Sequence, residues 1–297
     1  MNKIKIPALL QPFLDSSLES YFGETHPDIC DLANIYLHEA AFGFKVIESS
    51  LENLNTGDSI IEVGAGHGVL SRLLAAKGFN VTAYEPAQRE FSFMAKLRNA
   101  IDLAWIDGRA KPNWISEPFG LTPVRPNERA RLVFGISVLE HVSPLEPLLT
   151  AAYAALEPGG TALFTFPNYR WPYEPHFNMA TLWSKSLTYR VLAKKISDHK
   201  PLANSYTSQE LWDDLSWPVP SRIRSAMKSN GIPYEFSRSA FHIYVNRLRD
   251  SEFVERKGSA FRFLRLTSGL MTNLGNLVHP SLLPILELRL RRSGRQH

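Results

Sequence analysis

The segment Ile60-Ile61-Glu62-Val63-Gly64-Ala65-Gly66-His67-Gly68 is the most informative stretch of this 297-residue chain. An apolar run ends in three glycines and is followed by a helical pattern of leucines, which predicts a strand, a tight turn and a helix. Glycine lets backbone approach a ligand without interference from a Cβ atom. A second apolar run ends at Glu85, where an acid can accept hydrogen bonds from both hydroxyls of a ribose. Together these features predict a nucleoside site.

The spacing of the glycines distinguishes between nucleoside ligands. The dinucleotide fingerprint needs a small residue five positions after the first glycine, and Val69 occupies that position. The glycines instead alternate, with Glu62 just before them. This E-x-G-x-G-x-G pattern resembles motif I of the class I S-adenosylmethionine (SAM)-dependent methyltransferases. The resemblance implies that SAM is bound by Glu62, Gly64, Ala65, Gly66, Gly68, Glu85, Pro86, Asp107 and Ser137.

The segment Ser137-Val138-Leu139-Glu140-His141-Val142 extends this resemblance. It follows an apolar run and precedes Ser143-Pro144-Leu145-Glu146, in which Ser143 is expected to cap a helix and Glu146 to complete a capping box. His141 would then lie outside the carboxyl end of a parallel strand, where ligands of open α/β sheets bind. The string V-L-E-H-V resembles the corresponding segment of ubiquinone-biosynthesis O-methyltransferases.

The order of elements supports an α/β fold. Leu156-Glu157-Pro158-Gly159-Gly160 is expected to stop a helix ahead of a strand over 161–166, as in the family's passage into its fifth strand. A further strand is expected over 103–106, ending at Asp107, with a long irregular connection over 111–129. The resemblance covers about 60–168 and implies a Rossmann-like, mostly parallel sheet with a final antiparallel strand over 283–291.

Four zones are predicted along the chain. Residues 1–57 are interpreted as N-terminal helices that lean on the sheet, with one helix around 32–41 and a second around 46–51. Residues 58–168 form the SAM-binding core, because β-type runs alternate with helical patterns there. Residues 169–230 form the substrate loop and an inserted helical cap. Residues 231–297 complete the sheet and end in a basic tail.

Composition excludes several classes of protein. The hydrophobic fraction of 44% and the charged fraction of 21% are typical of a globular protein. Cys30 is the only cysteine, so the chain forms no disulfide within itself and no thiolate zinc cluster, and no metal ligands are assigned. The start lacks the apolar core of a signal peptide, and no run approaches the ~20 apolar residues of a spanning helix. A cytoplasmic protein is therefore expected.

The acceptor of the methyl group is expected to bind after the fifth strand. A hydroxyl acceptor must lose a proton, and histidine is the usual base near neutral pH, so His141 and His176 are the candidate catalytic residues. The proline-rich, aromatic loop 167–177 leaves the same edge of the sheet. The candidate acceptor-binding residues are Glu140, Tyr169, Tyr173 and Glu174. We expect O-methylation of a small molecule or a glycan precursor.

Two other functions remain open at this stage. A nucleic-acid methyltransferase fits the sequence pI of about 9.1, but the chain lacks the N/D-P-P-Y/F/W turn of the amino-group enzymes, and Cys30 lies in the wrong zone for a C5-cytosine enzyme. A non-catalytic SAM-binding or scaffold protein is the second alternative.

The positive charge is concentrated in the tail. From Arg256 onward there are eight arginines and lysines and one glutamate, so the rest of the chain is slightly acidic. The amphipathic stretch 261–277 is compatible with a helix on a membrane surface, although we favour helices that pack on the sheet.

Overall fold

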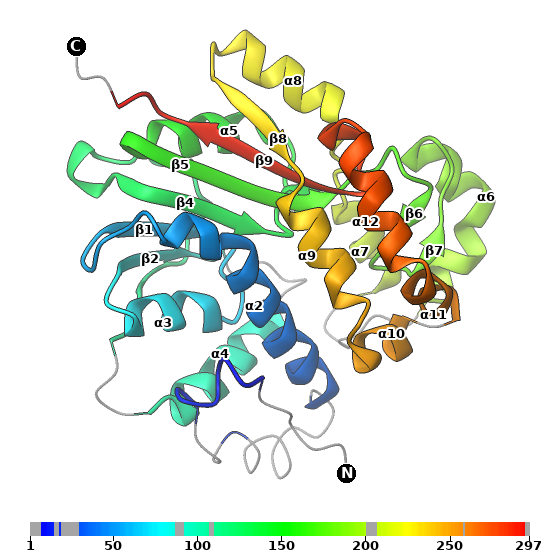
Figure 1. Ribbon diagram of the computed structural model, residues 1–297, viewed down its shortest axis with the longest axis horizontal. Coiled ribbons are helices and arrows are strands. Elements are labelled where there is room, and N and C mark those ends of the chain that lie inside the picture. The colour runs from blue at the N-terminus through cyan, green and yellow to red at the C-terminus, as the bar shows by residue number, and fades with distance from the viewer. Residues whose placement is uncertain are drawn as a thin grey trace.

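The computed structural model describes residues 7–14, 18, 30–86, 92–106, 110–199, 207–257 and 259–294. Within them a seven-stranded sheet has the order β3-β2-β1-β4-β5-β9-β8 (Figure 1). The strands are β1 Ser59–Val63, β2 Asn80–Tyr84, β3 Asn113–Ile115, β4 Ala130–Ile136, β5 Leu156–Pro167, β8 Tyr234–Ser237 and β9 Ile285–Arg291. The first five are parallel to their neighbours, and β9 runs antiparallel to β5 and β8. This confirms the Rossmann-like sheet with its final antiparallel strand.

Helices cover both faces of the sheet (Figure 1). The first face carries α2 Cys30–Leu51, α3 Val69–Ala76, α4 Ser92–Ala104 and α9 Ser239–Arg247. The second carries α5 Leu145–Ala154 and α8 Pro220–Ser229. Strand β4 contributes to the hydrophobic cores on both faces of the sheet. Leu132 and Phe134 lie in the core of the first face, and Val133 lies in the core of the second. Successive strand residues point to opposite faces, so an unbroken apolar run is needed in a sheet covered on both sides.

The prediction of two short helices before residue 57 was wrong, because α2 is continuous over Cys30–Leu51. Gly43, near the expected break, lies inside this helix. A Cβ atom there would come within 3.1 Å of the Leu70 side chain. This glycine therefore allows α2 to pack closely on α3, and it does not end the helix.

The strand expected over 103–106 was also wrong. Residues 103 and 104 belong to α4, and Trp105 makes only an isolated β-bridge with Leu14. The buried positions Leu97, Ala100, Ile101 and Ala104 recur at helical spacing, whereas Leu103 is exposed. The third strand, β3, lies inside the expected connection 111–129, which also contains the 3₁₀ helix η3 Pro126–Glu128. Asp107 lies outside the described residues.

Two helix-boundary predictions need correction. Helix α5 begins at Leu145 with Pro144 at its N-cap, so Ser143 and Glu146 form no capping box, and Glu146 instead accepts a hydrogen bond from Asn230 at 2.6 Å. Strand β5 already begins at Leu156, and its register with β4 shifts there, so Pro158-Gly159-Gly160 lies within the strand. Helix α5 ends at Ala154 and β5 begins at Leu156 with an irregular register, so no separate loop over 158–160 stops the helix.

A cap follows β5 and has a core of its own. It contains β6 Tyr173–Glu174, β7 Met179–Ala180, α6 Lys185–Ser197 and α7 Ser208–Asp214, and it lies beyond one end of the sheet (Figure 1). Helix α7 starts with a capping box formed by Thr207 and Glu210. The core residues of the cap are Tyr169, Phe177, Met179, Ile196, Leu211, Trp212, Leu215 and Trp217. Helix α8, which we expected in the cap, contributes Ile223 and Met227 to the second core of the sheet instead.

The C-terminal region contains α10 Ser251–Lys257, α11 Ser259–Leu266, α12 Ser268–Leu277 and the 3₁₀ helix η5 Pro280–Leu282 before β9. Helix α12 packs on α9 at Gly275, where a Cβ atom would lie 2.3 Å from the Phe241 ring. Helix α12 thus packs on the fold through α9, whereas we expected these helices to pack on the sheet itself. No helix within the described part of the chain combines the length and the hydropathy needed to cross a bilayer.

Candidate functional site

The glycine turn after β1 has a backbone that only glycine adopts easily. Gly64, Gly66 and Gly68 have φ values of +69°, +54° and +71°, all in the left-handed region. A Cβ atom would lie 2.5 Å from Val138 if added to Gly64, and 2.2 Å from the Trp114 ring if added to Gly68. The turn is therefore held tightly on two sides, and its backbone lies at the carboxyl edge of the sheet.

The end of β2 lies against this turn. The amides of Gly64 and Ala65 donate to the Tyr84 carbonyl at 2.8 and 3.0 Å, and the Gly66 amide donates to Glu85 Oε2 at 2.7 Å. Burial raises the pKa of Glu85, while the bond from Gly66 and the charge of Arg98 oppose that shift. Pro86 follows, half-buried, at the same edge. The glycines and the carboxylate are thus adjacent, as a nucleoside site requires.

Two arginines that sequence reasoning missed support the turn. Arg72 is fully buried, and its guanidinium donates to the carbonyls of His67 and Gly68 at 3.2 Å and pairs with Asp102 at 2.6 Å. Arg98 donates to the Gly66 carbonyl at 3.2 Å and lies over the Trp114 ring. The only signal for such roles is an arginine at an apolar position of a helical pattern.

Glu62 and His67 are buried on the helix side of the turn. Ser71 donates a hydrogen bond to Glu62 Oε2, and burial raises the pKa of Glu62 to about 8. His67 Nδ1 accepts from the Val69 amide at 3.1 Å, and burial together with the charges of Arg72 and Arg98 lowers the pKa of His67 to about 3. In this structure, therefore, both side chains brace the start of α3.

The buried Glu62 carboxyl predicts a pH-dependent stability. A pKa of about 8 in the folded state, against the ordinary value of 4.5 for a glutamate, means that the unfolded chain releases this proton at lower pH. The stabilisation is complete below pH 4.5 and is lost as pH rises through 8. We expect the free energy of unfolding to fall by on the order of a few kcal/mol across that window.

Denaturant unfolding between pH 5 and pH 8 tests this expectation. Glu62→Gln keeps an acceptor for Ser71 but cannot ionise, so its unfolding free energy should fall less steeply with pH. Glu52→Gln, at an exposed glutamate, is the matched control and should follow the unsubstituted protein. Equal pH slopes for all three proteins would contradict the assignment.

The carboxyl end of β4 forms the second part of the site. Ser137 has a φ of +55°, and its amide donates to the Thr165 carbonyl at 2.9 Å. The 3₁₀ helix η4, Leu139–His141, follows directly. Ser216 of the cap holds η4 in place, because its amide donates to the Glu140 carbonyl at 2.6 Å and its hydroxyl donates to the Leu139 carbonyl at 2.9 Å. Ser216 of the cap thus fixes the position of η4 at the carboxyl end of β4.

The two candidate catalytic histidines meet, and each is paired with a carboxylate. His141 Nδ1 lies 2.6 Å from Asp214 Oδ2, and His176 Nδ1 lies 2.7 Å from Glu174 Oε1. The two rings are in edge-to-face contact with centroids 5.1 Å apart. These pairs orient both imidazoles, and Asp214 is a functional candidate that sequence reasoning missed.

Glu174 organises the loop after β5. It is fully buried and accepts from the Phe177 amide at 2.6 Å and from the Tyr169 hydroxyl at 3.2 Å. Burial alone would raise the pKa of Glu174, but His176 and these hydrogen bonds lower it. Tyr169 is itself buried and stacks on Trp217 with ring centroids 5.0 Å apart.

Tyr173 does not join the histidines. Its hydroxyl donates to Asn178 Oδ1 at 2.6 Å, and its ring packs against Phe261 of α11. Adjacent residues of a strand point to opposite faces, so β6 places Glu174 inward and Tyr173 toward the C-terminal helices. Of the predicted acceptor residues, Glu140, Tyr169 and Glu174 are grouped around the histidines.

Glu140 completes a group that we name the Glu–His–His cluster: Glu140, His141 and His176. One nitrogen or oxygen atom from each lies within 4.8 Å of the others. Glu140 is 1% exposed, and burial raises its pKa to about 7. Val138, the residue before η4, lies against Gly64, where an added Cβ atom would come within 2.5 Å of it, so this end of β4 lies beside the glycine turn.

Comparison with known proteins identifies the family to which this chain belongs. A sequence model described as a methyltransferase domain matches residues 36–230. The chain belongs to this methyltransferase family. Together with the fold and the glycine turn, the match makes it a class I SAM-dependent methyltransferase.

Two relatives differ in the share of this chain that their sequences match. An uncharacterized protein of Mycobacterium tuberculosis strain H37Rv is 29% identical over 296 residues, covering 98% of both chains. A ubiquinone biosynthesis O-methyltransferase of Paramagnetospirillum magneticum is 33% identical over 113 residues, covering 38% of this methyltransferase and 42% of the relative.

A solved structure shows the same fold. The phosphoethanolamine N-methyltransferase 2 of Haemonchus contortus, in complex with S-adenosyl-L-methionine, matches with a TM-score of 0.50 at 15% identity. The match covers 94% of this methyltransferase, which spans 60% of the length of that protein.

The residues at the turn fit SAM. Gly66 has space around its Cβ position, with Met94 at 3.6 Å, and the buried Glu85 carboxylate lies beside it. The carboxyl end of β3 lies at this side of the turn, because the Glu85 amide donates to the Ile115 carbonyl at 3.0 Å.

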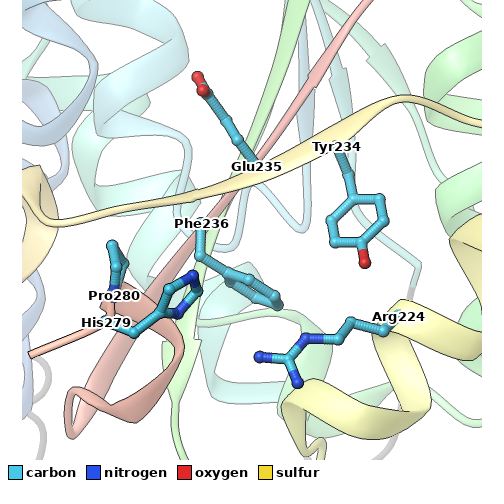
Figure 2. Close-up of a pocket in the computed structure, with 6 residues that line it drawn as sticks. All are labelled: Arg224, Tyr234, Glu235, Phe236, His279 and Pro280. Atoms are coloured by element: carbon cyan, nitrogen blue, oxygen red, sulfur yellow. The ribbon is translucent and has the colours of Figure 1, made fainter.

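A separate pocket lies at the edge strand of the methyltransferase sheet. It has a volume of about 380 Å³ and is lined by Arg224, Tyr234, Glu235, Phe236, His279 and Pro280. Figure 2 shows Tyr234 and Phe236 on the side of β8 that faces Arg224, while Glu235 points to the opposite side. None of the residues predicted to bind SAM or the methyl acceptor lines this pocket, so we assign the candidate site to the glycine turn and the Glu–His–His cluster.

Proposed function

We propose that this methyltransferase transfers the methyl group of SAM to a hydroxyl oxygen of a small molecule or a glycan precursor. The observation that carries this proposal is the Glu–His–His cluster, whose Glu140 and His141 follow Val138 at the carboxyl end of β4, beside the glycine turn. A hydroxyl must lose its proton as it is methylated, and oriented imidazoles at this position provide for that loss.

Bound SAM supplies a methyl group that is already activated by a sulfonium. The protein therefore has to align the acceptor and exclude water. Glu85 and the left-handed glycines would hold the nucleoside part. Asp214 and Ser216 of the cap hold His141 and η4, so that the cap closes over the acceptor side.

Aromatic side chains support a ring-shaped acceptor. Tyr169 and Trp217 form a buried stacked wall behind Glu174. Trp171 is 46% exposed, and its indole N–H donates to the Leu282 carbonyl at 2.7 Å, which fixes the ring at the start of the loop. The fixed, exposed face of Trp171 suits the apolar face of a sugar or a planar ring.

Transfer of isotope-labelled methyl from SAM to a panel of hydroxylated small molecules and glycan precursors tests the proposal. Each active acceptor is compared with its analogue in which the hydroxyl is replaced by hydrogen, and mass spectrometry locates the methyl group. RNA and DNA are included as acceptors. Labelling on nitrogen or on nucleic acid would contradict the proposal, and SAM binding without transfer to any member would favour a non-catalytic role.

We also propose contact with an anionic membrane surface through α11 and α12. Leu266, Leu270 and Leu277 are 84%, 60% and 81% exposed, and the exposed Arg262 and Arg265 lie on α11 beside them. Leucines that enter the interface next to arginines that meet lipid phosphates are typical of interfacial helices. A lipid-linked glycan precursor would be presented at such a surface.

Sedimentation with vesicles tests this contact. We expect binding to vesicles that contain phosphatidylglycerol, little binding to phosphatidylcholine alone, and at least about tenfold weaker binding for Leu270→Glu combined with Leu277→Glu. Leu121→Glu, at a leucine that is 71% exposed in the β3–β4 connection, is the matched control. Equal sedimentation of both variants would contradict a role for α12.

A further inference from the structure

The Glu–His–His cluster has the composition of a metal site. Two imidazoles and one carboxylate converge, with one ligand atom from each residue within 4.8 Å of the others. Neutral imidazole and carboxylate together suit zinc, manganese, iron and related divalent ions, whereas magnesium and calcium prefer oxygen ligands throughout. The cluster lies at the carboxyl ends of β4 and β5, beside the glycine turn.

The surroundings of the two rings are a second observation. His141 Nδ1 lies 2.6 Å from Asp214 and His176 Nδ1 lies 2.7 Å from Glu174. Histidine ligands of metals typically donate one ring N–H to a carboxylate, which determines the tautomer and directs the lone pair of the other nitrogen to the ion. Both histidines have this arrangement, and their carboxylate partners come from different segments of the cap.

Glu140 provides a third, independent observation. The residue is 1% exposed, and within the described part of the chain its Oε2 atom has no hydrogen-bond partner. A buried carboxylate oxygen without a partner is costly, and such groups are normally paired or coordinate a metal. This oxygen belongs to the residue that, with His141 and His176, forms the cluster.

We propose that Glu140, His141 and His176 bind one divalent transition-metal ion of the zinc or manganese class. The binding of the ion stands on these contacts alone, while its catalytic role rests on the proposed O-methylation. The remaining coordination positions would be taken by water or by the hydroxyl of the acceptor. The ion lowers the pKa of a bound hydroxyl, as it does that of bound water.

The chemical step is balanced without a further reactant. The O–H bond of the acceptor breaks and its proton passes to solvent. The oxygen then forms a bond to the methyl carbon, while the bond between that carbon and sulfur breaks and its electron pair stays on sulfur. The histidines and Glu140 hold the ion throughout, and Asp214 and Glu174 are positioning residues that act through the histidines.

Titration of the metal into the full-length protein tests the site. The protein is first treated with a chelator, and Zn²⁺, Mn²⁺, Co²⁺ and Mg²⁺ are then added separately and followed by calorimetry, with the visible spectrum of Co²⁺ as a second readout. We expect one equivalent of a transition ion to bind with a dissociation constant of about 1 μM or lower, and Mg²⁺ to bind far more weakly.

Variants locate the binding. Glu140→Gln and His176→Ala should weaken binding of the transition ion by about 100-fold or more, and Asp214→Asn by about 10-fold to 100-fold. His199→Ala is the matched control, because His199 lies beside the cluster against Phe177 without belonging to it. SAM affinity and thermal unfolding show that each variant is folded. Absence of one-equivalent binding, or equal affinity in all variants, would overturn the site.

The outcomes separate this inference from the proposed function. If the chelated protein methylates hydroxyls at the full rate, O-methylation stands and the catalytic role of the ion fails. If the ion binds at the cluster but methyl groups are found only on nitrogen, the metal site stands and O-methylation fails.

Discussion

Replacing His141 with alanine is expected to lower turnover by about 10²-fold or more while leaving SAM affinity nearly unchanged. His141 belongs to the cluster on the acceptor side, and it is oriented by Asp214 at 2.6 Å. In the proposed metal site its ring holds the ion that acidifies the hydroxyl, and without an ion the ring is the base that takes the hydroxyl proton. The glycine turn and Glu85 remain intact in this variant, so the nucleoside is still held.

Steady-state kinetics with an active acceptor, and calorimetry with SAM, measure the two effects separately. Asp214→Asn should reduce turnover less than His141→Ala, because the ring remains and only its orientation weakens. His199→Ala is the control for general loss of a histidine near the cap. Full activity of His141→Ala would mean that alignment alone drives the transfer and that the cluster has another role.

Replacing Gly66 with valine is expected to weaken SAM binding by more than about 100-fold. Gly66 has a φ of +54°, which a β-branched residue adopts only with strain. Its amide donates to Glu85 at 2.7 Å, so a change of backbone conformation also displaces the carboxylate that we expect to bind the ribose. The added Cβ would meet only Met94 at 3.6 Å, an ordinary contact, so the fold should survive.

Calorimetry with SAM and with S-adenosylhomocysteine measures this loss, and circular dichroism verifies folding. Gly231→Ala is the matched control, because Gly231 has a φ of +62° with open space around it, remote in sequence from the turn. The control should lose a little stability, on the order of 1 kcal/mol, and retain SAM affinity. Unchanged affinity in Gly66→Val would contradict the assignment of the turn to SAM.

Some local sequence patterns are compatible with both a helix and a strand, and the predictions were wrong at one of these. The run Leu103-Ala104-Trp105-Ile106 has β-prone residues, yet its first two residues end α4, because Leu97, Ala100, Ile101 and Ala104 bury one helical face against the first core. The actual third strand, β3, has only three residues, too few for a pattern of alternation to be visible.

Contacts between distant segments could not be predicted at all. Asp214 pairs with His141 across 73 positions, and Ser216 clamps η4 across a similar separation. These partners are brought together by the cap, whose own core is built around Trp212 and Trp217. The same applies to Glu140, because the burial of its Oε2 atom without a hydrogen-bond partner among the described residues depends on the segments packed around it.

The sequence by itself indicated most of the parallel sheet, the glycine turn and the cofactor class, although it misplaced the third strand. The alternate glycines, Val69 and Glu85 act through backbone conformation and through the shared carboxyl edge of parallel strands, which are local properties and properties of the fold class. Only the tertiary structure decided which side chains meet on the acceptor side. It turned Glu174 inward and Tyr173 outward on a two-residue strand, and it brought Asp214 to His141, because packing of the cap, rather than spacing along the chain, sets those distances.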